Sequence, residues 1–249
     1  MIVGFGNIDI SNLIWDNAPS IKKIGEISLI LFFAFMFFKY NEDLPQGKEG
    51  PKADNLAHKM LNALDFEAYK NTDYIEWTFK NLHHYKWEKS KNSCSVFWKE
   101  YKVDLNLNDK SLNKAYIHGF KVEGEMGEEL TNKALSYFNN DSFWLVAPYK
   151  IFDNGTERRL VELKNGEEHL LITYTKGGTT PGDSYLWSFE ENGMPKSFKM
   201  WTSILPIQGL ESSWSHWTIT ESGAKLPTYH NILFLGIEIT NIKGIKYNQ

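Results

Sequence analysis

An apolar segment at residues 138–153 limits the folds that are open to this chain. Its aromatic side chains include Phe143, Trp144 and Phe152, with four aliphatic residues among them, which is too much apolar surface for an exposed connector. Pro148 and the pair Asn139-Asn140 argue against one long helix, because proline and asparagine favour turns and helix ends. We therefore expect short helical turns pressed into the concave face of a sheet.

Strand-like patterns flank this segment on both sides. Ahead of it, Ile75, Trp77 and Phe79 alternate with polar residues, which is the period of a half-buried strand. The same reading predicts about four strands before the segment, at 75–80, 84–88, 95–104 and 114–122. About six are predicted after it, at 158–163, 170–175, 185–189, 198–204, 213–220 and 232–240, with Pro206 and Pro227 as separators.

Two helical patterns complete the domain. Residues 53–69 carry apolar side chains at helical spacing, and Met126–Phe138 repeats the pattern before Asn139, Asn140 and Asp141 end it. The order of elements predicts an α+β, mainly β fold. We expect a large curved, mostly antiparallel sheet with helices covering its concave face.

The N-terminal part differs from the rest. We expect residues 1–23 to be a disordered lead and residues 24–40 to be a signal peptide or an uncleaved membrane anchor, because Lys22-Lys23 precede the apolar run Ile27–Phe38. As a helix this run would extend roughly 18 Å, short of the ~30 Å hydrocarbon core. A buried helix of a soluble protein is the third interpretation.

Residues 41–52 are rich in Pro, Gly and charged residues, which is typical of a linker, so the folded domain is predicted at 53–249. Both export interpretations of residues 24–40 place Lys22 and Lys23 on the cytoplasmic side. The domain is then exported, either periplasmic or membrane-anchored and facing the periplasm.

Charge and cysteine content exclude several classes of protein. The formal net charge is -4 and the pI is about 6.0, which is unsuited to binding nucleic acid. Cys94 stands alone, so no cysteine-based metal cluster can form, and no phosphate-binding, dinucleotide-binding or nucleophile-elbow motif occurs. We expect no metal site, no catalytic residues and no cofactor.

Aromatic residues are abundant, with 9 Trp, 12 Tyr and 16 Phe. Acyl chains are held by apolar area, so an aromatic face would suit a lipid cavity. The candidate ligand-binding residues are Trp77, Phe79, Trp87, Trp98, Phe143, Trp144, Leu145, Tyr185 and Trp187. Periodicity alone does not distinguish a lined cavity from a filled core, and both interpretations stay open.

The order of elements over 53–249, the segment Phe143–Asp153 and the exported lead together resemble the lipoprotein-carrier (LolA/LolB-like) fold family. The loop Gly178–Tyr185 with Trp187 is similar to uncharacterised envelope proteins of this fold. The resemblance implies an open half-barrel whose helices cover a cavity for acyl chains. It implies an envelope protein that binds a lipid, an acyl chain or a lipoprotein, with other envelope proteins as further partners.

Two other functions compete with this one. A structural or assembly module would use the same sheet with a filled core and present Gly177–Asp183 to a partner. A hydrolase would need two carboxylates, or a histidine and a carboxylate, in one cleft; Asp141, Asp153 and Asp183 are the loop candidates, although each also suits a turn or cap. His83-His84 should point to opposite faces of a strand, and in Trp214–Trp217 only Trp214 and His216 should share a face.

Overall fold

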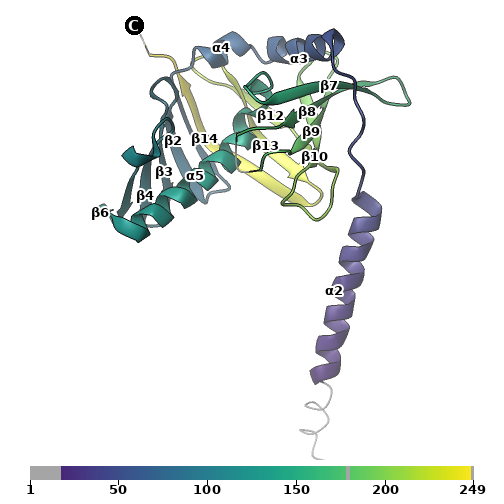
Figure 1. The fold of residues 1–249 in the computed structure, drawn as a ribbon, viewed down its shortest axis with the longest axis horizontal. Coiled ribbons are helices and arrows are strands. Elements are labelled where there is room, and N and C mark those ends of the chain that lie inside the picture. The colour runs from purple at the N-terminus through teal and green to yellow at the C-terminus, as the bar shows by residue number, and fades with distance from the viewer. Residues whose placement is uncertain (1–17, 178–179, 248–249) are drawn as a thin grey trace, which may run out of the picture.

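The computed structural model describes residues 18–177 and 180–247. Its strands form one antiparallel 14-stranded sheet in the order β6-β5-β4-β3-β2-β1-β14-β13-β11-β10-β9-β8-β7, with β12 paired to β13 (Figure 1). The first group of strands comprises β1 (Tyr74–Phe79), β2 (His83–Glu88), β3 (Ser93–Trp98), β4 (Tyr101–Asn106), β5 (Lys114–Ile117) and β6 (Phe120–Val122). The second comprises β7 (Thr156–Glu162), β8 (Glu168–Tyr174), β9 (Ser184–Phe189), β10 (Pro195–Trp201), β11 (Leu210–Ser213), β12 (Ser215–Ile219), β13 (Lys225–Ile232) and β14 (Leu235–Ile245).

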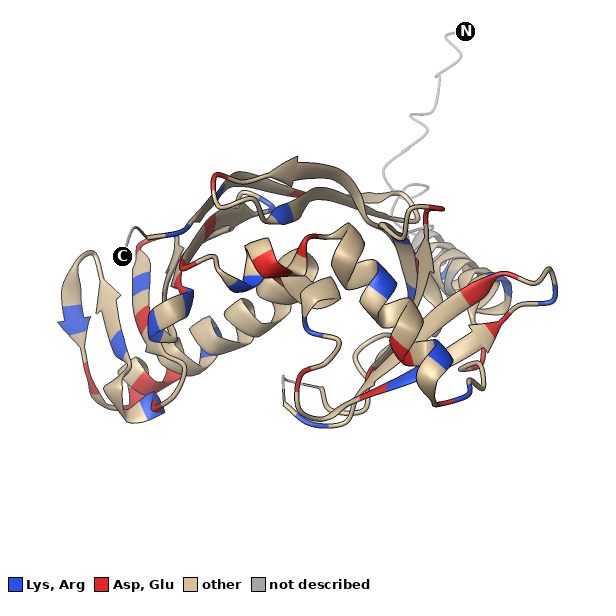
Figure 2. Ribbon diagram, turned by 90° about the horizontal axis from the view of Figure 1, so that it is seen from above, with Lys and Arg blue, Asp and Glu red and all other residues tan. Residues whose placement is uncertain are grey.

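The last strand joins the two groups, because β14 pairs with β1 on one side and β13 on the other. The helices are α2 (Ala18–Tyr40), α3 (Pro51–Ala63), α4 (Phe66–Lys70) and α5 (Gly124–Val146), with the short 3-10 turns η1 (Lys89–Lys91), η2 (Lys110–Leu112) and η3 (Ala147–Tyr149). Seen from above, the sheet curves around α5 (Figure 2). The predicted fold class, a curved antiparallel sheet with helices in its mouth, is confirmed.

The two faces of the sheet bury separate sets of side chains. On β8 and β9, Leu170, Ile172, Tyr185 and Trp187 belong to the main core on the concave side. The intervening residues Leu171 and Leu186 belong to a smaller cluster with Val161 and Trp201 on the other side. Both faces therefore need cover here, which explains why this part of the sequence is more continuously apolar than a one-sided sheet requires.

The helix before the apolar segment does not end at Asn139. α5 continues to Val146, and Pro148 lies in η3, where a proline at the start of a helical turn is tolerated. The buried positions Leu130, Ala134, Phe138, Asp141 and Leu145 form one helical stripe that faces the sheet. Burial of this stripe outweighs the weak turn preference of the asparagines, so the expected helix end and the expected cap at Asp141 are both wrong.

The predicted strand positions are mostly right and their boundaries are not. The run 95–104 is two strands joined by a tight turn at Lys99, whose φ is 48°, and 114–122 divides at His118 and Gly119. Pro227 lies inside β13 instead of separating strands, opposite Trp217 of β12. Proline is accepted there because β13 pairs with β14 only from Tyr229 onwards, so one side of β13 has no strand partner at Pro227.

α2 stands away from the sheet (Figure 1). It begins at Ala18, so residues 18–23 of the expected disordered lead are helical, while residues 1–17 lie outside the described residues. Its described side chains include large apolar residues exposed on all sides, such as Ile30, Leu31 and Phe38. Over 18–177 and 180–247, no helix combines the length and apolar composition needed to cross a membrane.

Residues 41–49, which we interpreted as part of a linker, form a strap across the convex face of the sheet. The main chain of Lys48 exchanges two 2.8 Å hydrogen bonds with Leu160 of β7. The Glu42 carboxylate accepts a hydrogen bond from the Lys199 ammonium group at 2.6 Å. The main-chain carbonyl of Glu42 accepts one from the indole N–H of Trp201 at 2.8 Å. The strap thus joins α2 to the sheet at a defined place and covers the outer apolar cluster.

Gly47 provides a test of the strap. A Cβ at this position would lie 2.7 Å from the Cβ of Arg159 and 3.0 Å from the Leu160 carbonyl oxygen, so Gly47→Val should force the strap off the sheet. Overpacking of this kind costs about 1–3 kcal/mol, and each 1.4 kcal/mol lost should raise the rate of tryptic cleavage after Lys48 about tenfold. Gly25→Val is the control, because nothing lies within 4 Å of a Cβ at Gly25. Equal cleavage rates in both variants would contradict the strap.

Candidate functional site

The structure brings all nine predicted ligand-binding residues to the concave face. Trp77 and Phe79 lie on β1, Trp87 on β2, Trp98 on β3, and Tyr185 and Trp187 on β9; Phe143, Trp144 and Leu145 lie on the last turns of α5. Trp77, Leu145 and Trp187 are fully buried, whereas Phe143 and Trp144 are only partly buried and pack against the same core. The side chains share one face but form two groups, which meet α5 at Tyr137–Phe138 and at Phe143–Leu145.

The first group lies between α5 and strands β1–β3. The rings of Trp77 and Tyr85 stack with their centroids 4.5 Å apart, and Phe138 of α5 meets Trp87 edge-on at 5.4 Å. Tyr137, also on α5, lies between His83 at 3.9 Å and Trp98 at 5.6 Å. Both α5 residues pack against rings on the face of these strands, so this part of α5 is closely packed.

The second group lies between the end of α5 and strands β9–β13. Phe143 contacts Tyr185 at 4.6 Å and Trp144 contacts Phe198 at 5.6 Å between ring centroids. Behind them, Phe198 and Trp214 both contact Trp187, with ring centroids 5.0 Å apart in each pair. Phe198 and Trp214 were absent from the predicted set, although the alternation along β10 contained the signal for Phe198.

Several polar atoms in this apolar face lack partners. Among the described residues, the indole nitrogens of Trp77, Trp87, Trp187 and Trp214 and the Nε2 atom of His230 are buried without a hydrogen bond. Native cores pair nearly all of their buried donors, and an unpaired one costs about 1–3 kcal/mol. Four unpaired indole N–H groups on one face are therefore costly if the face serves only as a core.

His230 adds an acceptor to these donors. Its Nδ1 atom lies 2.9 Å from the Ser213 carbonyl oxygen, so Nδ1 carries the proton. Nε2 makes no hydrogen bond, although the Trp144 main chain lies close enough to the ring to act on its pKa. Burial lowers the pKa of His230 to about 4, which keeps the ring neutral near pH 7. Trp214 meets this ring edge-on at 4.5 Å and Trp144 lies 5.3 Å away. The site thus has a polar corner between β13 and the end of α5.

A buried carboxylate near the C-terminal end of α5 connects the helix to β2. Oδ2 of Asp141 accepts hydrogen bonds from the Tyr85 hydroxyl at 2.6 Å and from Nδ1 of His83 at 2.7 Å, and Oδ1 accepts one from the Asn140 side chain at 2.8 Å. The carboxylate is thereby satisfied despite its burial. We call Asp141, His83 and Tyr85 the latch, because they connect the covering helix to the sheet.

The three aspartates considered for hydrolysis do not share a site. Asp141 lies in α5 and not in a loop. The Asp183 carboxylate accepts hydrogen bonds from the Thr180 hydroxyl and, at 3.1 Å, from the main-chain N–H of Ser203. Asp153 forms an ion pair with Lys150 on the surface. A histidine and a carboxylate do meet in His83 and Asp141, but the same oxygen also holds Tyr85. Within the described ranges, no three His, Cys, Asp or Glu residues gather closely enough for a metal ion.

The alternation expected through Trp214–Trp217 is broken. His216 has a φ of 54°, and this left-handed residue rotates the following strand so that Trp214 and Trp217 stack at 6.1 Å while His216 packs on Tyr229. The predicted pairing of Trp214 with His216 on one face is therefore wrong. Asp141 and His230 were also missed as parts of the concave face, since a polar residue in a helix or strand gives no periodic signal of its own.

Comparison with known proteins gives no match to a protein-family model or to a curated protein sequence. Among solved structures, a DUF1329 family protein from Desulfovibrio piger aligns with a TM-score of 0.39 and 9% identity, covering 77% of this chain and 92% of that one. A domain assigned to an outer membrane lipoprotein-sorting protein from Vibrio parahaemolyticus aligns with a TM-score of 0.36 and 10% identity. This alignment covers 78% of this chain and 95% of that one. Both TM-scores are below 0.5, so the function is argued from the site itself.

The latch can be tested by removing its carboxylate. Asp141→Leu should lower the free energy of unfolding by about 3 kcal/mol, because Tyr85 and His83 then keep buried donors without an acceptor. Tyr85→Phe in the same background should restore part of that loss, since it removes one of the stranded donors. Urea unfolding of both single variants and the double variant completes the cycle. Strictly additive losses would show that the two side chains do not interact.

The buried histidine predicts a loss of stability in mild acid. Its pKa is lowered from 6.5 to about 4 in the folded state, so below pH 6.5 the unfolded chain binds a proton that the folded chain does not. Stability should fall as the pH drops from 6.5 towards 4, by about 3 kcal/mol in total, and show no further change from this group below that. In His230→Phe the slope over this range should flatten. An unchanged slope in the variant would assign the acid sensitivity to another group.

Proposed function

We propose that this protein binds the apolar part of a lipid, a free acyl chain or the acyl chains of a lipoprotein, on the concave face of its sheet beneath α5. One observation carries the proposal: the face is built from aromatic rings and leaves four indole N–H groups and one imidazole nitrogen without partners. Apolar area would hold the chain of such a ligand, each buried methylene contributing about 0.8 kcal/mol.

The unpaired atoms indicate which end of the ligand lies where. Indole N–H groups donate only, so Trp187 and Trp214 suit carbonyl or carboxylate oxygens, and Nε2 of His230 suits a hydroxyl donor. Esters and carboxylic acids of lipids carry these groups at the polar end of an acyl chain. The ligand would place its polar end at the corner formed by Trp214 and His230, where unpaired donors lie beside an unpaired acceptor. Its chain would extend towards Trp77 and Trp87, whose indole N–H groups would stay unpaired.

Entry of the ligand requires α5 to move. The rings are packed in this structure, so the helix would part from the sheet to admit a chain and close to exclude water. Its apolar contacts can be exchanged for contacts with the ligand at little net cost, since both are apolar. The latch at Asp141 gives the movement a defined hinge, because the last turn of α5, beyond Asp141, carries the partly buried residues Phe143 and Trp144.

The proposed location is the cell envelope, facing the periplasm. The exposed apolar surface of α2 supports this location, because a helix that is apolar all round needs an apolar partner, either an export machinery or a lipid phase. We propose binding without catalysis and without a cofactor. Other envelope proteins are further proposed partners, and nucleic acid is not, in keeping with the net charge of -4.

A structural or assembly module is the second candidate. The close ring packing in both aromatic groups beneath α5 favours it, because a filled core needs no ligand. The loop proposed to meet a partner, Gly177–Asp183, contains residues 178 and 179, which lie outside the described residues. The two candidates differ in one measurable property: only the first predicts that lipid accompanies the purified protein.

Two Trp→Phe variants separate the candidates. After expression with the export segment, native mass spectrometry should find lipid on the wild type and much less on Trp214→Phe, which keeps the ring and loses the N–H. Stability of the lipid-free Trp214→Phe should be unchanged or slightly higher, because an unpaired buried donor is removed. Trp201→Phe is the control: it breaks the bond to Glu42 on the convex face and should cost about 1 kcal/mol without affecting bound lipid.

Absence of lipid from the wild type, even after incubation with fatty acids and phospholipids, would reject the lipid-binding function and favour the module. Equal lipid in the wild type and Trp214→Phe would leave a lipid-binding protein whose unpaired indoles take no part in binding.

A further inference from the structure

Five loops and turns lie along one end of the curved sheet, and we call this end the rim. They are the β1–β2 turn (80–82), the β3–β4 turn (99–100), the β5–β6 turn (118–119) with Phe120, the β10–β11 loop (202–209) and the β13–β14 turn (233–234) with Leu235. Outside α2, many of the large exposed apolar side chains occur here: Leu82 is 61% exposed, Phe120 78%, Ile204 69%, Phe234 74% and Leu235 58%.

Strand register places these turns side by side. Phe79 at the end of β1 pairs with Ile239 near the start of β14, and the Lys80 amide bonds to the Glu238 carbonyl at 2.9 Å. Further along, the His118 amide bonds to the Glu100 carbonyl at 3.0 Å, which joins the β3–β4 and β5–β6 turns.

On the other side of β14, Ser212 pairs with Ile232, so the β10–β11 loop ends next to the β13–β14 turn. The rim is therefore a continuous arc of neighbouring turns, because the strands that they join lie side by side, about 4.8 Å apart.

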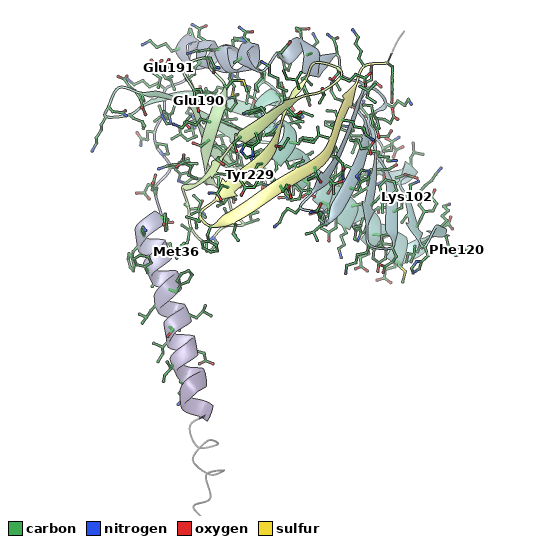
Figure 3. The ribbon with its side chains drawn as sticks, turned by 180° about the vertical axis from the view of Figure 1, so that it is seen from behind. Met36, Lys102, Phe120, Glu190, Glu191 and Tyr229 are labelled. Atoms are coloured by element: carbon green, nitrogen blue, oxygen red, sulfur yellow. The ribbon has the colours of Figure 1, made fainter. Side chains whose placement is uncertain are left out.

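α2 leaves the domain at the same rim. In the β10–β11 loop, the main-chain N–H of Gln208 donates to Oδ1 of Asn41 at 3.0 Å. The main-chain carbonyl of Gln208 accepts a hydrogen bond from the main-chain N–H of Glu42 at 2.9 Å. Met36 and Tyr40, in the last turns of α2, pack against the main core. Figures 1 and 3 show α2 running away from the domain on this side; in Figure 3, Phe120 lies at this end and Glu190 and Glu191 at the opposite one.

We propose that the rim docks on the surface of a phospholipid bilayer, with α2 entering the lipid beside it. The proposal rests on the envelope location proposed above and adds the orientation of the domain. Single apolar side chains at the tips of turns would insert among the headgroups, while exposed Lys80 and Lys99 on the same turns would meet lipid phosphates. The acidic pair Glu190-Glu191 would face away from the membrane.

A bilayer fits these features better than a second copy of the chain. The exposed side chains are spaced along an arc of separate turns and alternate with charged residues, whereas a protein interface needs a contiguous apolar centre. Ahead of Met36, the large apolar side chains of α2 from Ile24 to Phe35 that the structure describes are exposed around the helix, which a surrounding lipid phase satisfies and a single protein partner on one side does not. In this orientation one open end of the half-barrel faces the bilayer from which an acyl chain would come.

An environment-sensitive fluorophore on a single cysteine tests the docking. The natural Cys94 is 2% exposed and burial raises the pKa of its thiol, so it reacts slowly and the wild type measures the background. The full chain carrying Phe234→Cys is labelled and mixed with phosphatidylethanolamine–phosphatidylglycerol vesicles. Ile219→Cys is the matched control, because Ile219 is 69% exposed and precedes the turn 220–224 at the opposite end of the sheet.

The expected result is a several-fold rise in fluorescence with a shift to shorter wavelength at position 234, and little change at position 219. No change at 234, or equal changes at both positions, would overturn the proposal. A change at 234 that needs no vesicles and grows with protein concentration would assign the rim to a second copy and would also overturn it. Lipid found on the purified protein by mass spectrometry is independent of this outcome, so docking and ligand binding can fail separately.

Discussion

The packing of α5 into the concave face is the interaction on which the rest of the structure depends. A curved sheet of this size presents a wide apolar surface, with Trp77, Tyr85 and Trp187 fully buried, and it does not close on itself. Without a cover, that surface would be exposed to water at a cost of about 1.5–3 kcal/mol for each large side chain. One helix, running from β6 to η3, covers both halves of the sheet, and this accounts for its length and for the aromatic rings at its end.

The opposite face shows a second solution to the same problem. The small cluster of Val161, Leu171, Leu186 and Trp201 is covered by an extended strap, whose main chain pairs with β7 at Lys48. Because the strap continues directly into α2, covering the convex face also fixes where the N-terminal helix leaves the domain. The stretch that joins α2 to the sheet is therefore a structural element of the sheet. The direction of α2 and the position of the rim follow from the same few hydrogen bonds at Glu42 and Gln208.

The sequence was sufficient for the architecture and insufficient for its details. Period-2 patterns identified the sheet and its concave aromatic residues, because each of those side chains alternates with a polar or outward-facing neighbour. The length of α5 was missed because local turn preference at Asn139-Asn140 was weighed without knowledge that Asp141 would meet Tyr85 and His83, a contact between residues 56 and 58 positions apart. Left-handed residues such as Lys99 and His216 changed strand boundaries and faces, and neither residue type signals that conformation in advance.

The side chains of the proposed site are also the core of the domain, and this sets a limit on how the site can work. A core is most stable when every ring is packed and every donor is paired, whereas a binding face must give up some packing to a ligand. In this structure the rings are packed but four indole N–H groups are unpaired, so the face is neither a complete core nor an open cavity. A bound lipid must make more favourable interactions with the sheet than the α5 contacts that it replaces. Hydrogen bonds to the unpaired indole N–H groups would provide the additional interactions. Sequence periodicity identified this face, whereas the unpaired state of its buried nitrogen atoms is visible only in the structure.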